Sequence, residues 1–144
     1  NRLVQAADCL AFSLDDEVFI QSGSSTYIPK HCKYKNFIDA EDYENMIENC
    51  SLLITHSGIG TIMRGINAGK PVIVVPRLKE YNEHVDDHQK EIAEAFAHKH
   101  CVIECDDVHD LGKAIDKTKT FHFEPYVSHG GKIEDIISDF MDLF

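Results

Sequence analysis

The stretch "LLITHSGIGT", residues 52–61, joins an apolar run to a turn that is rich in small residues. The apolar run predicts a buried strand, and the residues after the turn predict a short helix that ends at Gly69. Gly58 and Gly60 allow the backbone between strand and helix to approach a ligand with no Cβ in the way. The N–H groups and the positive dipole end of the helix face the same place, so the turn predicts a site for phosphate or diphosphate.

Side chains around the two glycines favour the same ligand. Ser57 and Thr61 offer hydroxyl groups, and His56 can donate a hydrogen bond from the end of the strand. The alternative is that the glycines only make a tight turn and that Thr61 only caps the helix. The turn matches neither a Walker loop, since no G-K-[ST] follows, nor a full G-x-G-x-x-G, since position 63 is Met.

Outward from this turn, short apolar runs alternate with amphipathic segments. Residues 72–75, Val-Ile-Val-Val, form a β-branched run that is typical of a strand buried on both faces. We expect the other strands at residues 18–20, 35–38, 52–55 and 102–103, and the other helices at about 3–11, 39–47, 86–96, 108–115 and 133–144. Strands that alternate with helices predict a three-layer α/β fold around a mainly parallel sheet. Ligands of such sheets bind outside the carboxyl ends of the strands, where the turn lies.

The composition describes one acidic, globular domain over residues 1–144, with 43% hydrophobic residues and a net charge of −11. A chain this acidic is a poor general binder of nucleic acid, because phosphate backbones need clustered Lys and Arg. No run approaches the roughly 20 apolar residues of a membrane span, and we expect no signal peptide. The five cysteines form no C-x-x-C pair, which favours reduced thiols over a disulfide or zinc framework.

A second polar segment, "RLKEYNEHVDDHQ" at residues 77–89, directly follows the β-branched run. A solvated loop and helix start would explain its charges, but not the crowding of acidic, histidine and amide side chains at residues 83–89. His84, Asp87 and His88 share one helical face and could bind a metal, but no further strong ligand is obvious, so we expect no metal. Such side chains suit the hydroxyl groups of a sugar better.

Three motifs at these spacings resemble the C-terminal, donor-binding domain of MurG-like glycosyltransferases, which belong to family 28 and have the GT-B fold. The motifs are H-S-G-I-G-T from His56, G-K-P-V-I-V-V-P-R from Gly69 and E-H-V-D-D-H-Q from Glu83. The resemblance covers residues 53–96, and the upstream arrangement fits too. It is nearest to short bacterial exopolysaccharide glycosyltransferase subunits. The chain is similar also to the cytosolic subunit of the two-part eukaryotic transferase that adds the second GlcNAc to dolichol-linked sugar.

The resemblance implies the C-terminal half of a GT-B fold, with a Rossmann-like sheet and a UDP-sugar donor site. These residues would bind the donor: His56, Ser57, Gly58, Gly60, Thr61, Arg77, Asp87, His88 and Gln89. Ser57, Gly58, Gly60 and Thr61 would hold the diphosphate, and His56 would start that loop. Arg77 would add positive charge, and the last three residues would bind the sugar. No cofactor is implied, because helix N–H groups can stabilise the leaving diphosphate without a metal.

The reaction that the resemblance implies also needs a base to deprotonate the acceptor hydroxyl. Glu83 and His84 line the same cleft and are the catalytic candidates in this chain, although a partner or a preceding loop could supply the base instead. Two features depart from the family pattern. Relatives often carry an acidic residue, which can bind ribose, where this chain has Arg64. Relatives also open with a strand and a glycine loop, whereas we expect a domain that lacks both.

From the resemblance we expect a cytoplasmic hexosyltransferase subunit, peripheral at the inner face of the membrane. It would move a GlcNAc- or Gal-type group from a UDP-sugar to a lipid-linked acceptor in exopolysaccharide, other polysaccharide or glycolipid assembly. A GT-B site is a cleft between two domains, so we expect a heterodimer with a membrane-anchored, acceptor-binding subunit. The alternative is a non-catalytic subunit that binds the nucleotide sugar or a partner and only enhances a catalytic protein. An epimerase-like enzyme of the same fold would need both halves in one longer chain.

Overall fold

The computed structural model describes residues 2–12, 14, 17–23, 25–56, 58–76 and 88–125. The helices are α1 (Arg2–Ala11), α2 (Ala40–Asn49), α3 (Ile59–Asn67), α4 (His88–His98) and α5 (Leu111–Thr118), with a 3₁₀ turn, η2 (Val108–Asp110), before α5. The strands are β1 (Phe19–Gln21), β2 (Lys33–Lys35), β3 (Leu53–Thr55), β4 (Val72–Val74) and β5 (Ile103–Glu104). The predicted alternation of strands and helices is confirmed over this part of the chain. The helix expected at 133–144 lies outside the described residues.

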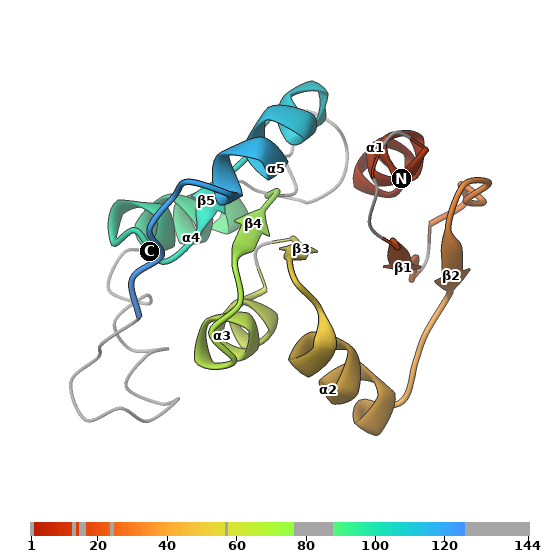
Figure 1. Cartoon of the computed structure of the whole chain (residues 1–144), viewed down its shortest axis with the longest axis horizontal. Helices are drawn as coiled ribbons and strands as arrows, with labels where there is room; N and C mark the ends of the chain where they lie inside the picture. The colour runs from red at the N-terminus through yellow and green to blue at the C-terminus, as the bar shows by residue number, and fades with distance from the viewer. Residues whose placement is uncertain are drawn as a thin grey trace.

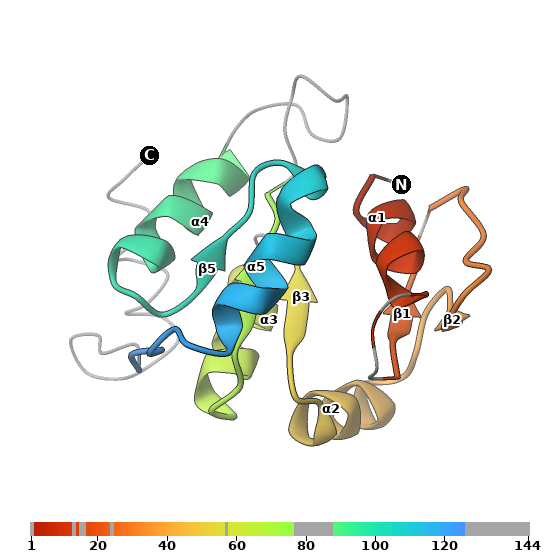
Figure 2. The same cartoon turned by 45° about the horizontal axis from the view of Figure 1, so that its top comes forward.

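The strands form two parallel sheets. β4 lies in the middle of the larger sheet, with β3 on one side and β5 on the other, and Ile73 pairs with both Ile54 and Ile103. β1 pairs with β2 in a separate two-stranded sheet. β1 lies between β3 and β2 in both views, so the edge that pairs with none of the described strands faces the larger sheet (Figures 1 and 2).

Two apolar clusters cover the two faces of β4. Val72 and Val74 pack with α3 and α4 in a cluster that includes Phe96. Ile73 and Val75 point the other way and pack with α1, α5 and β5. Figure 1 shows this arrangement, with α5 and α1 on one side of the strands and α3 and α2 on the other. The three-layer α/β prediction and the strand buried on both faces are therefore confirmed.

Local sequence signals explain several element ends. Asp39 caps α2, as predicted, since its carboxylate accepts a hydrogen bond from the N–H of Asp42 at 2.8 Å. β2 was expected at residues 35–38 but ends at Lys35. The reason is the partner strand, because β1 ends at Gln21 and the chain turns at Gly23, whose φ is +57°. A strand cannot extend its ladder beyond the end of its neighbour.

A buried carboxylate fastens α1 to the loop between β1 and β2. Asp8 is fully buried, and its oxygens accept hydrogen bonds from the N–H groups of Lys30 and His31 at 2.8–3.0 Å. The hydroxyl of Tyr27 donates a further hydrogen bond at 2.7 Å, and the thiol of Cys32 lies at 3.4 Å. Because the buried charge is met by donors on every side, it fixes the loop against the helix.

Candidate functional site

The predicted phosphate-binding turn lies between β3 and α3, at the carboxyl end of the sheet. Gly58 is the N-cap of α3, and no side chain caps it. The first N–H that reaches back into the helix is that of Ile62, which donates to the carbonyl of Gly58 at 3.0 Å. The N–H groups of residues 59–61 therefore precede the intrahelical ladder, as at any helix start, and are available to a ligand.

The fold itself does not require glycine at either position of this turn. Gly58 has φ −86° and ψ 119°, which any residue can adopt. Neither Gly58 nor Gly60 has a positive φ, and a Cβ added to either would meet no atom of the described residues within 4 Å. Both residues are exposed. The alternative in which the glycines only make a tight turn therefore finds no support in backbone geometry or packing.

His56 points one ring nitrogen back into the sheet. Its Nδ1 lies 2.7 Å from the carbonyl oxygen of Val75, beyond the end of β4. A carbonyl can only accept, so Nδ1 carries the proton, and Nε2 of the neutral ring is an acceptor. The expected hydrogen bond from His56 to a phosphate thus requires the imidazolium form.

Thr61, the third residue of α3, contacts the neighbouring helix α2. Its Oγ1 lies 2.5 Å from the hydroxyl of Tyr43. Arg64, one turn further along α3, lies over the ring of Tyr43 at 5.2 Å and forms an ion pair with Glu44 at 3.0 Å. The position at which the family pattern leads us to expect an acidic residue is therefore occupied here by a cation that is bound to α2.

Arg2 places a cation at the same end of the sheet, and the sequence did not predict it as a site residue. Its guanidinium donates to the carbonyls of Pro76 and Asp106, at 3.1 and 3.2 Å, just past β4 and β5. These partners are 74 and 104 residues away in sequence, and no local signal predicts such contacts. Arg2 therefore joins the start of α1 to the carboxyl ends of two strands.

A carboxyl pair lies at the end of β5, formed by Glu104, its last residue, and Asp106. Lys90, in the first turn of α4, forms an ion pair with Asp106 at 2.7 Å. One carboxyl oxygen each of Glu104 and Asp106 is buried without a hydrogen-bond partner among the described residues. Burial raises the pKa of Glu104 to about 7, and the neighbouring charge of Asp106 contributes in the same direction. The pKa of Lys90 is also raised, chiefly by its hydrogen bond to Asp106.

The second predicted segment is described only in part. Gln89 is half-buried in the first turn of α4, and His88 is the first residue of that helix. The remaining predicted site residues lie outside the described part of the chain: Ser57, Arg77, Glu83, His84 and Asp87. The turn and α4 start both follow strands of one parallel sheet, β3 and β4 in turn, so the described site residues lie toward the same end of it.

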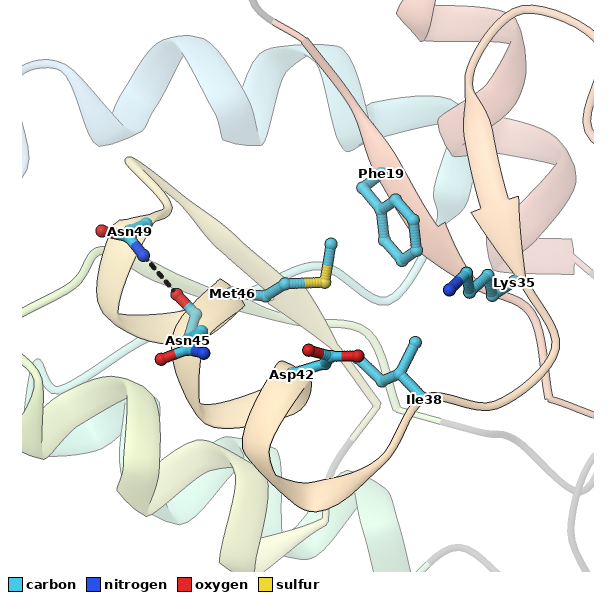
Figure 3. A pocket seen from close by; sticks show the side chains of 7 residues that line it. All are labelled: Phe19, Lys35, Ile38, Asp42, Asn45, Met46 and Asn49. Carbon is cyan, nitrogen blue, oxygen red and sulfur yellow. Dashed lines mark hydrogen bonds between the residues drawn. The ribbon is translucent and has the colours of Figure 1, made fainter.

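An apolar cavity of about 270 Å³ lies elsewhere, between β1 and α2 (Figure 3). The side chains of Phe19 and Met46 point toward one another across it, with Ile38 beside them. Four polar or charged residues complete the lining: Lys35, Asp42, Asn45 and Asn49. None of the described donor-site residues lines this cavity, so it is not the site at the α3 turn.

Comparison with known proteins shows the family to which this sequence is similar. The model described as "Glycosyltransferase family 28 C-terminal domain" matches residues 1–130. A UDP-N-acetylglucosamine–N-acetylmuramyl-(pentapeptide) pyrophosphoryl-undecaprenol N-acetylglucosamine transferase of Prochlorococcus marinus (strain MIT 9312) is 36% identical over 77 residues, which are 51% of this chain and 21% of that protein. The UDP-N-acetylglucosamine transferase subunit ALG13 of Mus musculus is 28% identical over 89 residues, which are 58% of this chain and 7% of that protein. The matched region therefore spans about a fifth or less of the length of these relatives.

Proposed function

This chain belongs to the glycosyltransferase family 28 C-terminal domain family, a Rossmann-like half of a GT-B fold, and we propose that it is the donor-binding subunit of a hexosyltransferase. A UDP-sugar binds at the α3 turn. A GlcNAc- or Gal-type group then passes to a lipid-linked acceptor in polysaccharide or glycolipid assembly. Both relatives are named for transfer of N-acetylglucosamine, and the name of the bacterial one includes a pyrophosphoryl-undecaprenol, which supports this class of acceptor.

The observation that carries the proposal is the glycine at position 60. Glycine in a helix costs about 1 kcal/mol relative to alanine. Within the part of the chain that the structure describes, neither a positive φ nor a close neighbour requires glycine at this position. A diphosphate that approaches the N–H groups of residues 59–61 would meet a Cβ at this position, so ligand binding supplies the missing reason for glycine.

In the proposed reaction, the acceptor hydroxyl oxygen attacks the anomeric carbon of the donor sugar. The bond from that carbon to the diphosphate oxygen breaks, and the hydroxyl proton passes to a base, for which Glu83 and His84 are the candidates in this chain. The N–H groups at the start of α3 stabilise the negative charge that develops on the leaving UDP, and the positive charge of Arg77 adds to this stabilisation. Asp87, His88 and Gln89 orient the sugar.

A partner subunit supplies the acceptor side of the cleft. We place the chain at the cytoplasmic face of the membrane through this partner. Among the described residues, no helix combines the length and apolarity needed to cross a bilayer. The second candidate function is a non-catalytic subunit that binds nucleotide sugar or a partner and enhances a catalytic protein. The mouse relative is itself named as a subunit, which supports a role within a complex.

Isothermal titration calorimetry with UDP tests the donor site, and the chain offers a matched pair of variants. Gly60 and Gly112 are each the second residue of a helix, and neither crowds its neighbours, since a Cβ at Gly112 would meet Leu10 at an ordinary 3.6 Å. We expect Gly60→Ala to weaken UDP binding by at least about tenfold, through loss of charge-assisted hydrogen bonds. Gly112→Ala should leave UDP binding unchanged. Equal UDP affinity in wild type and folded Gly60→Ala would contradict the donor site.

A further inference from the structure

The contact between α2 and α3 places a second hydroxyl next to the proposed donor site. The hydroxyl of Tyr43 lies 2.5 Å from Oγ1 of Thr61, and Tyr43 is half-buried. Thr61 is in the first turn of α3, beside the N–H groups that precede the intrahelical ladder. Tyr43 thus contacts a residue of the site from a helix that contributes nothing else to the donor set.

The direction of this hydrogen bond decides what Thr61 can do. A threonine hydroxyl has one hydrogen and two acceptor lone pairs. If Thr61 donates to Tyr43, its hydrogen is consumed and it has none for a phosphate oxygen. If Tyr43 donates, Thr61 accepts, and its own hydrogen remains for an anionic ligand. A phenol is the more acidic hydroxyl and so the better donor, and hydrogen bonds in such a chain strengthen one another.

The surrounding charges hold the ring of Tyr43 in place. The guanidinium of Arg64 lies 5.2 Å from the ring centroid, a distance typical of a cation–π contact. Glu44 in turn binds Arg64 at 3.0 Å, although both side chains are about half exposed, so solvent screens this pair. The ring is therefore held between its own helix and α3, with its hydroxyl directed at Thr61.

We propose that Tyr43 is a positioning residue for the donor diphosphate. It donates a hydrogen bond to Thr61 and so directs the hydroxyl hydrogen of Thr61 to a diphosphate oxygen. This inference rests on the proposed function, because it places the diphosphate at Thr61. It adds a residue of α2 that the motifs do not contain.

A double-mutant cycle tests the proposal by calorimetry with UDP. Tyr43→Phe removes only the phenolic oxygen, and we expect it to weaken UDP binding by about three- to tenfold, as for loss of a hydrogen bond. In a Thr61→Val background the same change should have no further effect, because the hydroxyl through which Tyr43 acts is gone. Thr61→Ser keeps a hydroxyl and should remain sensitive to Tyr43→Phe. Tyr34→Phe, on β2, is the matched control and should bind UDP as the wild type does.

Uridine binding separates this role from a purely structural one, because a general disturbance of the site would weaken uridine and UDP alike. Uridine lacks the diphosphate, so ligand-observed NMR should show equal uridine binding by wild type and Tyr43→Phe. Unchanged UDP affinity in Tyr43→Phe would overturn the role of Tyr43 and leave the donor site in place. The same would follow if Tyr43→Phe weakened UDP binding equally in the wild-type and Thr61→Val backgrounds. A wild-type chain that binds no UDP would overturn the proposed function and this inference together.

Discussion

Asp8 shows most clearly what a single residue contributes that the sequence does not reveal. The apolar face of the first helix was predictable from Leu3 and Leu10, but Asp8 reads as a solvated residue of its polar face. In the fold it is fully buried, with donors from residues 27–32 around it. His56 and Thr61 were predicted as ligand donors, yet each also bonds within the protein, to Val75 and Tyr43. Such partners are distant in sequence, so no local pattern predicts them.

The first prediction concerns acid stability. Burial alone would raise the pKa of Asp8, but hydrogen bonds from Lys30, His31 and Tyr27 outweigh it and lower the pKa to about 2, from 3.8. A carboxyl whose pKa is lower in the folded state stabilises the fold above its unfolded pKa, and the stabilisation is lost as the pH falls from there toward 2. We expect Asp8→Asn to lower the free energy of unfolding near pH 7 by about 1–3 kcal/mol, because buried donors lose an acceptor.

Urea unfolding at pH 7 and at pH 3 measures this effect. The difference between wild type and Asp8→Asn should shrink at the lower pH, as the wild type loses the same interaction. Asp116→Asn, on the exposed face of α5, is the control and should change stability by less than about 0.5 kcal/mol. A difference that is the same at both pH values would show that the charge of Asp8 is not the stabilising feature.

The second prediction concerns Glu104, where the sign is reversed. Burial raises its pKa to about 7, aided by Asp106, while Lys90 opposes the shift and Glu94 adds to it. An acid whose pKa is raised in the folded state stabilises the fold fully below its unfolded pKa of 4.5. This stabilisation is lost as the pH rises through the folded pKa of about 7. Glu104→Gln cannot ionise. It should therefore melt at a higher temperature than wild type at pH 8.

The gain from Glu104→Gln should disappear at low pH, where both the folded and unfolded wild-type chains carry the proton. Thermal melts followed by circular dichroism across this range measure it. Glu48→Gln, at an exposed position of α2, should show no pH-dependent difference from wild type. A variant that melts lower than wild type at pH 8 would mean that ionised Glu104 is stabilised by its surroundings.

At the scale of elements, α3 contains two glycines with opposite roles. A Cβ at Gly65 would lie 2.7 Å from Leu53 and 2.8 Å from Val72, so this glycine allows the helix to pack closely on β3 and β4. Gly60 has no such neighbour. We expect Gly65→Ala to lower the free energy of unfolding by about 1–3 kcal/mol through overpacking, despite the better helix propensity of alanine.

Gly60→Ala provides the matched control within the same helix, since its Cβ points into open space and its stability should equal or exceed that of wild type. Chemical unfolding of the two variants separates a packing glycine from a ligand-binding one. Equal stability of Gly65→Ala and wild type would mean that Leu53 and Val72 move aside at little cost.

Element patterns predicted more of this fold than residue patterns did. The β-branched run at residues 72–75 and the Asp39 cap depend on neighbouring residues alone, and both were correct. β2 was misplaced because its end depends on β1, a neighbour in space. Local composition predicted the glycine turn, but the open space around Gly58 and Gly60 in the folded chain depends on contacts that composition does not encode. The sequence therefore predicts features that depend on neighbouring residues, and it fails to predict features that depend on contacts between residues far apart in the chain.

At the scale of the whole molecule, the division into two parallel sheets indicates where the first strand of the family pattern, which we expect this domain to lack, would fit. Among the described strands, none pairs with the edge of β1 that faces β3 (Figure 1). Arg2 brings the start of α1 to the carboxyl ends of β4 and β5. A strand before α1 would end there, run parallel to them and form a right-handed βαβ unit with β1. The apolar cavity beside Phe19 would lie next to it.

This placement predicts that an added strand stabilises the domain. A version extended before Asn1 by an apolar strand and a short glycine loop should melt at a higher temperature. The amides of β1 and β3 should also exchange hydrogen more slowly, since edge N–H groups become paired. An extension of equal length with proline at alternate positions is the control, because proline cannot donate to a ladder. Unchanged exchange in β1 and β3 would place the strand elsewhere.

The last prediction is that the donor site alone does not give transfer. The matched region corresponds to about a fifth or less of the relatives' length, and the described residues form one α/β unit around one candidate donor site. A GT-B reaction needs a second surface that holds the acceptor, and an acidic chain with a net charge of −11 is not drawn to an anionic membrane. We therefore expect the isolated chain to bind UDP but to transfer little sugar to a lipid-linked acceptor, and co-expression with a membrane-anchored partner to restore transfer.

Transfer from UDP-[¹⁴C]GlcNAc and UDP-[¹⁴C]Gal measures both states, with Gly60→Ala in the complex as the control for donor binding. If the complex retains full transfer with Gly60→Ala, the partner holds the donor and this chain is the non-catalytic subunit. Full transfer by the isolated chain would remove the need for a partner.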